Sequence, residues 1–147
     1  MLKISKKVEY SLMILKHFLD YGENQQCTAR MICERYKIPF DTTSKVMQIM
    51  NNHHILASNQ GVKGGYKLNM DLSSLTYLDF LKIIEGKDFQ RLCTKDACSL
   101  VETCNIIGPI DKLNQYLYLF FENLNVQSLL QQNMIDGLTQ IKTEANI

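Results

Sequence analysis

The 147-residue sequence predicts a mainly α-helical fold with one small β-hairpin. Apolar residues recur at helical spacing in several separate segments, which is typical of amphipathic helices. One glycine-rich stretch, Gly61–Gly65, lies between two short segments in which apolar and polar residues alternate, and this pattern indicates a hairpin. A further apolar stretch follows Pro109 and predicts a long C-terminal helix.

Three helices precede the hairpin in this prediction. The second and third are short and are separated by about four residues around Pro39, which fits a helix-turn-helix. The hairpin follows the third helix directly. This order of elements is that of a winged helix-turn-helix, in which the hairpin is the wing. The predicted helices, with their N-caps, are residues 5–20 (Ser5), 29–36 (Thr28) and about 42–52 (Asp41 or Thr42).

The second half of the chain is predicted to be helical on both sides of a cysteine-rich loop. A helix capped by Ser73 or Ser74 is expected to stop at Gly86. Pro109 is expected to be the first residue of a long helix that continues to about residue 123. A last helical segment, capped by Ser128, is expected to continue to about residue 141.

The long C-terminal helix is apolar nearly all round, because residues 116–121 are consecutive apolar residues. Such a helix needs cover on more than one side, and we expect a second copy of the chain to supply it. The predicted organisation is therefore a winged helix-turn-helix DNA-binding domain (1–86), a cysteine-rich loop that binds a metal cluster (87–108), and a dimerisation helix with a C-terminal helix (109–147).

The charges are divided unevenly along the chain. Residues 1–70 carry ten Lys or Arg against five Asp or Glu, whereas residues 71–147 carry six against ten, and the net charge is +1. The basic half coincides with the predicted winged helix, so we expect only that half to face a polyanion. No segment is apolar enough to span a bilayer and the first residues do not resemble a signal peptide, so we expect a cytoplasmic protein.

Three of the five cysteines lie in the predicted loop. Cys93, Cys98 and Cys104 have the spacing C-x4-C-x5-C, and a helix could not aim three thiols with this spacing at one point. An odd number of cysteines in a reducing compartment favours metal or redox chemistry over structural disulfides. The other two, Cys27 and Cys33, are expected to be a turn residue and a small core residue.

Five parts of the chain carry a family resemblance: Ile4–Tyr10, Ser58–Leu68, Leu75–Asp79, Ile84–Gly86 and the three loop cysteines. Together they resemble the Rrf-type family of winged-helix transcription regulators, which includes IscR, NsrR, RsrR and CymR. The resemblance runs nearly end to end, and the combination of the glycine-rich wing with a three-cysteine loop is its most specific part. It implies a homodimeric, DNA-binding transcription regulator, which we expect to be a repressor.

The resemblance also implies a cofactor. Many members of the family bind an iron–sulfur cluster through cysteines, and here these would be Cys93, Cys98 and Cys104. It further implies an acidic fourth ligand from the first helix of the other subunit, a position that Glu9 of the partner subunit would fill. The resemblance favours a 4Fe-4S cluster, with a 2Fe-2S cluster as the alternative. The cluster would sense nitric oxide, redox state or iron–sulfur status.

The second helix of a helix-turn-helix places its N-terminal part in the DNA major groove. Hydroxyl and amide side chains there can read base edges. Lysines at the wing tip and near the first helix can reach the minor groove or phosphates. Gln60 stands where the family usually has arginine, and with few arginines we expect modest, salt-sensitive affinity. The predicted DNA contacts are Thr42, Thr43, Ser44, Lys45, Gln48, Lys63, Lys3, Lys6 and Lys7.

The loop cysteines are also compatible with chemistry that involves no iron–sulfur cluster. A metal-free thiol switch would pair Cys93 with Cys98 or Cys104, and a zinc site would use the same three thiols. No histidine lies in the loop to complete a usual zinc site, and Ile107 stands where IscR has a histidine ligand. A small electron carrier or cluster-delivery protein would need the cysteines but not the hairpin. An enzyme is not expected, because we find no nucleophile–base pair, phosphate loop or paired carboxylates.

Overall fold

The computed structural model describes residues 4–22, 25–61, 64–87 and 98–132. The chain divides into two compact units, one of Met1–Ser74 and Ile83–Gly86, the other of Leu75–Lys82 and Lys87–Ile147. The described residues form six helices and one two-stranded antiparallel sheet. The predicted fold class, mainly helical with a single hairpin, is therefore confirmed. Within the described ranges, no helix has the length and apolar character needed to cross a membrane.

Helices α1 and α2 of the first unit begin where the sequence provides a side-chain cap. Helix α1 spans Lys6–Tyr21, and the Ser5 hydroxyl accepts a hydrogen bond from the Val8 backbone N–H. Helix α2 spans Ala29–Tyr36, and Thr28 caps it in the same way. A hydroxyl at this position satisfies one of the backbone donors that the first turn leaves without a partner. Both predicted N-caps are confirmed.

Helix α3 begins earlier than predicted. It spans Phe40–Asn52, so Asp41 and Thr42 lie in its first turn and neither is the N-cap. Pro39 occupies the N-cap position in an extended conformation, with φ −64° and ψ 134°, and makes no side-chain cap bond. A proline has no backbone N–H to satisfy and its φ is already fixed, so the helix can start directly after it.

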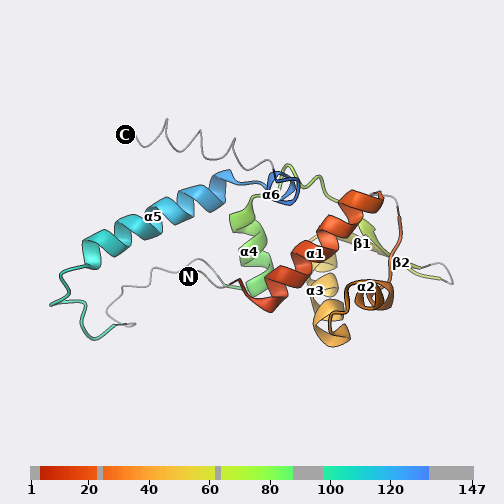
Figure 1. Ribbon diagram of the computed structural model, residues 1–147, viewed down its shortest axis with the longest axis horizontal. Helices are drawn as coiled ribbons and strands as arrows, with labels where there is room; N and C mark the ends of the chain where they lie inside the picture. The colour runs from red at the N-terminus through yellow and green to blue at the C-terminus, as the bar shows by residue number, and fades with distance from the viewer. Residues whose placement is uncertain (1–3, 23–24, 62–63, 88–97, 133–147) are drawn as a thin grey trace. The chain divides into compact units, whose positions relative to one another are not determined.

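The hairpin follows α3 and packs on it. Strand β1 spans Leu56–Asn59 and pairs antiparallel with β2, Gly65–Leu68, so that Leu56 lies opposite Leu68. Both leucines are buried. Helix α3 contacts α1, α2 and β1, which makes it the central element of this unit (Figure 1). Three helices and a hairpin in this order form a winged helix-turn-helix.

Helix α4 contributes residues to both units and starts later than predicted. It spans Tyr77–Glu85, and Thr76 caps it in place of Ser73 or Ser74. The Thr76 hydroxyl accepts a hydrogen bond from the Asp79 backbone N–H at 3.0 Å and donates one to the Asp79 carboxylate at 2.9 Å. The two serines instead form hydrogen bonds within the turn that precedes the helix.

Helices α5 and α6 of the second unit also differ from the prediction at their starts. Helix α5 spans Ile107–Asn123 and includes Pro109 in its first turn, where a missing N–H costs nothing. Helix α6 spans Val126–Leu130, and its N-cap is Asn125, whose side chain accepts a hydrogen bond from the Ser128 N–H at 2.7 Å. The predicted continuation to about residue 141 lies outside the described residues.

Backbone hydrogen bonds join the two ends of the second unit's described part. The Tyr77 N–H donates to the Leu124 carbonyl at 2.6 Å, and the Val126 N–H donates to the Leu75 carbonyl at 2.9 Å. The Tyr77 ring also meets the Phe121 ring edge-on, with centroids 5.2 Å apart. The start of α4 is therefore fixed to the end of α5 and the start of α6.

Candidate nucleic-acid interface

Helix α3 is the second helix of the helix-turn-helix, and its two faces differ. Val46, Met47 and Met50 are completely buried. Lys45 and Gln48 are exposed. Because the apolar residues recur with the helical period, their burial fixes which polar side chains point outward. The outward face of this helix is the one that a helix-turn-helix presents to the major groove.

Thr43 does not belong to this outward face. Its side chain is fully buried, and its hydroxyl donates a hydrogen bond to the Pro39 carbonyl at 2.8 Å. A hydroxyl bonded to the preceding turn of its own helix is not available to a base edge. The structure therefore removes Thr43 from the predicted DNA contacts. Thr42 and Ser44 are half-buried.

The N-terminus of α1 lies on the same unit and carries two lysines. Lys6 and Lys7 are the first residues of the helix, and both are exposed. A helix N-terminus has a partial positive charge, so anions are stabilised there. The Lys6 ammonium pairs with the Glu9 carboxylate at 2.7 Å, and this hydrogen bond raises the pKa of Lys6. The pair is solvent-exposed and contributes little to stability. Either side chain can therefore leave the pair and interact with another group.

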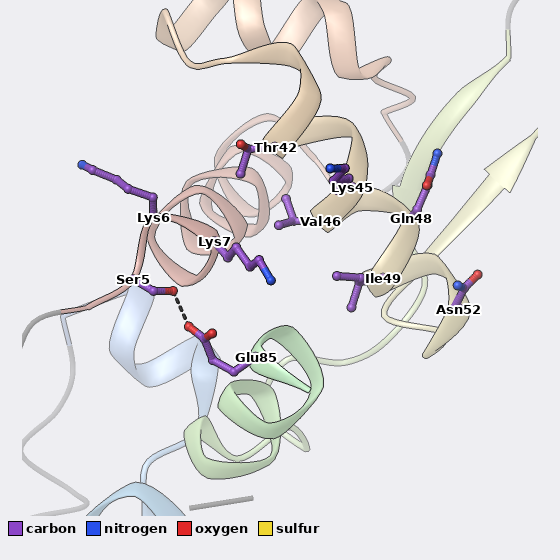
Figure 2. A pocket seen from close by; sticks show the side chains of 10 residues that line it. All are labelled: Ser5, Lys6, Lys7, Thr42, Lys45, Val46, Gln48, Ile49, Asn52 and Glu85. Atoms are coloured by element: carbon purple, nitrogen blue, oxygen red, sulfur yellow. Dashed lines mark hydrogen bonds between the residues drawn. The ribbon is translucent and has the colours of Figure 1, made fainter. Parts of the chain in front are cut away.

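The N-terminus of α1 and the outward face of α3 border an open pocket of about 530 Å³. Figure 2 shows the side chains that line it. The pocket brings together five of the predicted DNA contacts. Three ammonium groups on such a surface suit DNA phosphates, and amide side chains suit base edges. The pocket is lined by Ser5, Lys6, Lys7, Thr42, Lys45, Val46, Gln48, Ile49, Asn52 and Glu85.

Three polar lining residues were not among the predicted contacts. Asn52 is four residues after Gln48 and hence on the same face of α3, a spacing that the sequence already contains. Ser5 is the N-cap of α1, and Glu85 is the last residue of α4. The Ser5 hydroxyl donates a hydrogen bond to the Glu85 carboxylate although the two residues are 80 positions apart. No local sequence pattern indicates a contact over that separation.

The wing is attached to the helices through Cys27. The backbone of Cys27 exchanges two hydrogen bonds with Tyr66 of β2, each 2.9 Å long. Gly65 permits this approach, because a Cβ on Gly65 would lie 3.0 Å from the Cys27 carbonyl oxygen. Cys27 is therefore paired with the sheet, and it is not the simple turn residue that was predicted. The two other predicted lysine contacts, Lys3 and Lys63, lie outside the described residues.

The Cys27 side chain belongs to a buried polar cluster around His17 of α1. His17 Nε2 lies 3.0 Å from the Cys27 sulfur, and Nδ1 lies 2.9 Å from the Tyr36 hydroxyl. Burial lowers the pKa of His17, the nearby Arg35 guanidinium lowers it further, and Asp20 acts in the opposite direction. Burial also raises the pKa of the Cys27 thiol. Both groups are thus favoured in their neutral forms, which indicates a structural cysteine and not a reactive one.

Two of the three loop cysteines fall within the described residues. Cys98 and Cys104 are free thiols and half-buried. A short turn separates them, in which the Val101 N–H donates to the Cys98 carbonyl. Among the described residues, no group of three or more His, Cys, Asp and Glu is placed to hold a metal ion. Cys93 lies outside those residues, so the three-cysteine site stays a prediction.

The fold defines the class of the protein as a winged helix-turn-helix protein, a class that commonly binds DNA. The sequence matches the family model of Rrf2, described as an iron-dependent transcriptional regulator, over residues 4–132. That match covers most of the chain, and the protein belongs to the Rrf2 family of transcriptional regulators. It is accordingly a regulator and not an enzyme.

Two relatives match along nearly their whole length. A Lactococcus lactis protein named as the HTH-type transcriptional regulator YffB is 26% identical over 139 residues, which cover 89% of this chain and 88% of the relative. Protein aau3 of Rhizobium meliloti is 23% identical over 148 residues, which cover 99% of this chain and 90% of the relative. Both alignments are long enough to include the wing and the loop cysteines.

Solved structures with the same fold include two regulators. CymR, the global cysteine regulator of B. subtilis, has a TM-score of 0.66 and 19% identity, and the alignment covers 90% of this chain and 98% of CymR. IscR of T. potens has a TM-score of 0.61 and 17% identity, covering 90% of this chain and 88% of IscR. At this level of identity the likeness establishes the fold alone.

The neutral state of His17 makes stability depend on pH. Because its pKa lies below the ordinary 6.5, the unfolded chain binds more protons than the folded chain below about pH 6.5. The contribution of His17 is therefore complete above that pH and is lost as the pH falls toward the lower pKa of the folded state. We expect the urea midpoint to decrease from about pH 7 to about pH 5 and His17→Gln to flatten this dependence.

His53→Gln is the matched control for this measurement, because His53 is exposed at the end of α3. The slope of the urea midpoint against pH in this variant shows how much of the pH dependence arises from a surface histidine. Equal slopes for the wild type and His17→Gln would contradict the assignment of the pH dependence to His17.

Proposed function

We propose that the protein is a homodimeric DNA-binding repressor whose DNA affinity is controlled by an iron–sulfur cluster. The cluster is held by Cys93, Cys98 and Cys104, with Glu9 of the partner subunit as the fourth ligand, and it senses nitric oxide, redox state or iron–sulfur status. The observation that carries the DNA-binding part is the lysine-lined pocket between α1 and α3. The description of the family as iron-dependent supports the iron part.

The donors among the described residues suit an iron–sulfur cluster. Cys98 and Cys104 are unpaired thiols that are accessible in part, and thiolates are the main ligands of such clusters. The Glu9 carboxylate is engaged in a weak surface ion pair and can leave it. When bound, the cluster supplies a redox-active iron centre. A carboxylate is a weaker ligand for iron than a thiolate, which suits a position that must respond to a signal.

The Lys6–Glu9 ion pair connects the proposed ligand to the DNA-binding surface. Lys6 lines the pocket, and Glu9 lies one turn further along the same helix. If Glu9 moves to the cluster, Lys6 loses its carboxylate partner and its charge becomes available to a DNA phosphate. Without the cluster, Glu9 continues to neutralise that charge. The cluster-bound form is therefore expected to bind DNA more tightly than the cluster-free form.

Homodimerisation is proposed from the apolar residues of α5. No residue of this helix is buried, and Leu113 and Leu119 are 52% and 38% exposed. A second copy packed against α5 would cover these leucines. A two-fold dimer also presents two recognition helices to successive half-sites.

A metal-free thiol switch is the second candidate. It would pair Cys93 with Cys98 or Cys104 and requires no metal. Of these three, Cys98 and Cys104 lie within the described residues and are free thiols. A zinc site would use the same thiols. Metal and sulfide analysis separates these possibilities from a cluster.

Protein purified without oxygen is expected to contain iron and acid-labile sulfide in similar amounts and to absorb visible light. Replacing Cys93, Cys98 and Cys104 together by Ala should remove iron, sulfide and colour, because the thiolates are the main ligands. Cys33→Ala is the control, since Cys33 is a half-buried cysteine of α2. A colourless protein that stays iron-free after anaerobic reconstitution would reject the cluster, and its zinc content and thiol oxidation state would identify the alternative.

Cluster-bound protein is expected to bind its own upstream DNA several-fold more tightly than cluster-free protein at low salt, because one more lysine becomes available to phosphate. Glu9→Gln should reduce this difference, since the neutral side chain no longer pairs with Lys6 in either form. Glu34→Gln, which removes an exposed carboxylate of α2, should preserve it. Fluorescence anisotropy measures the affinity of each form for DNA, and footprinting shows which bases each form protects. Equal affinity and equal footprints for the two forms of the wild type would exclude cluster control.

Leu113→Asp combined with Leu119→Asp should weaken dimerisation at least about tenfold, because a charge would be buried at the centre of the contact. Met31→Asp places the same charge on a 49% exposed residue of α2 and should leave the dimer intact. Analytical ultracentrifugation over a range of concentrations gives the dissociation constants. A wild-type protein that is monomeric at high micromolar concentration would refute the dimer.

A further inference from the structure

Among the described residues that line the pocket, Glu85 is the only acid. We propose that Glu85 limits the affinity of this pocket for DNA: its carboxylate, held by Ser5 at the N-terminus of α1, occupies part of the place that a backbone phosphate would take. The inference rests on the DNA-binding role proposed for the pocket, but it requires neither the cluster nor a particular operator sequence.

The hydrogen bonds of Ser5 place the Glu85 carboxylate at an anion-binding position. The Ser5 hydroxyl accepts a hydrogen bond from the Val8 N–H at 3.3 Å, so its own proton is directed elsewhere, and it is donated to Glu85. The N-terminal turn of α1 offers partial positive charge to any anion nearby. A phosphate entering the pocket would be drawn to the same turn. Figure 2 shows the Ser5–Glu85 bond at one edge of the pocket, with Lys7 extending from α1 into the space beside it.

The position of Glu85 within its own helix is unfavourable for a carboxylate. Glu85 is the last residue of α4, and the C-terminus of a helix carries partial negative charge. Gly86 follows with a φ of +67°, which ends the helix directly after the acid. The surroundings that favour the carboxylate are therefore those of the pocket, namely the Ser5 hydroxyl and the lysines. In the absence of DNA, the Ser5 hydroxyl and the lysines stabilise the Glu85 carboxylate. When DNA is bound, the same groups would also interact with a phosphate.

The charge of Glu85 is not cancelled by a direct ion pair in the described structure. The three ion pairs found among those residues are Lys6–Glu9, Lys16–Asp20 and Lys82–Asp79, and Glu85 is in none of them. Its carboxylate therefore repels an incoming phosphate across the open pocket. Repulsion between exposed charges is strong at low salt and is screened at high salt, so the effect has a recognisable ionic-strength dependence.

Glu85→Gln separates the charge from the hydrogen bond, because the amide oxygen can still accept the Ser5 proton. Cluster-free full-length protein is titrated with a fluorescent mixed-sequence DNA duplex. Glu85→Gln is expected to bind about three- to tenfold more tightly than the wild type at low salt, with a smaller gain at high salt. Glu34→Gln, an exposed carboxylate of α2 that does not line the pocket, is expected to change the affinity less than about twofold.

A double-mutant cycle with Lys7→Gln tests whether the gain arises in the pocket. If Glu85 repels the same phosphate that Lys7 attracts, the increase in DNA affinity caused by Glu85→Gln is smaller in the Lys7→Gln background. A gain that is unchanged in the Lys7→Gln background overturns the proposal, because it indicates an effect elsewhere. Urea midpoints confirm that each variant is folded. Glu85→Ala also removes the charge, and this second variant should likewise bind DNA more tightly than the wild type.

Affinity of Glu85→Gln equal to or below that of Glu34→Gln overturns the inference. Loss of the iron–sulfur proposal would leave the experiment unaffected, because the protein used contains no cluster and the duplex contains no operator. Failure of the wild type and of Glu85→Gln to bind any duplex at low salt would overturn the DNA-binding role of the pocket together with this inference.

Discussion

Burial of one face of α3 is the constraint on which the DNA-binding unit depends. Val46, Met47 and Met50 are fully enclosed between α1, α2 and β1, and no other rotation of the helix would keep all three in the core. A rotation that brought Lys45 inward would bury an ammonium group without a partner, which is costly. The outward direction of Lys45 and Gln48 thus follows from the packing of the apolar face. The polar surface of α3, which we propose faces DNA, is therefore set by the core beneath it.

Much of this fold could be predicted from the sequence because its signals are local. Helical periodicity predicted helices α1 to α5, and the Gly61–Gly65 stretch predicted the hairpin. Helix α6 shares only its last two residues with the helix that was predicted there. The caps divide into two groups. Ser5 and Thr28 each stand as the evident capping residue before an apolar pattern, and both predictions are confirmed. At residues 73–76 and 125–128, two or more polar residues stand near the start of a helix. Each could accept the capping hydrogen bond from a backbone N–H of the first turn, and the sequence alone does not say which one is the N-cap.

The site was predictable only in part, for a related reason. Lys45 and Gln48 follow from helical spacing, and Lys6 follows from its place at a helix N-terminus. Thr43 was predicted as a DNA contact from its position in the helix-turn-helix alone. The prediction did not consider that the side chain is buried and that its hydroxyl bonds to the Pro39 carbonyl. Contacts between residues distant in sequence leave no local pattern. The bond from Ser5 to Glu85 and the approach of His17 to Cys27 are of this kind, and they are visible only once the chain is folded.

The charges of the pocket suggest why its affinity for DNA would be adjustable. Lys6 is paired with Glu9, and Glu85 accepts a hydrogen bond from Ser5, the N-cap of α1. In the proposed DNA complex, these two carboxylates would compete with phosphate near the start of the helix. The net attraction is then a small difference between opposing terms. Because these charges are largely exposed and are screened by salt, we expect displacement of one carboxylate to change the affinity several-fold at low salt. A change of this size requires no large rearrangement of the recognition helix.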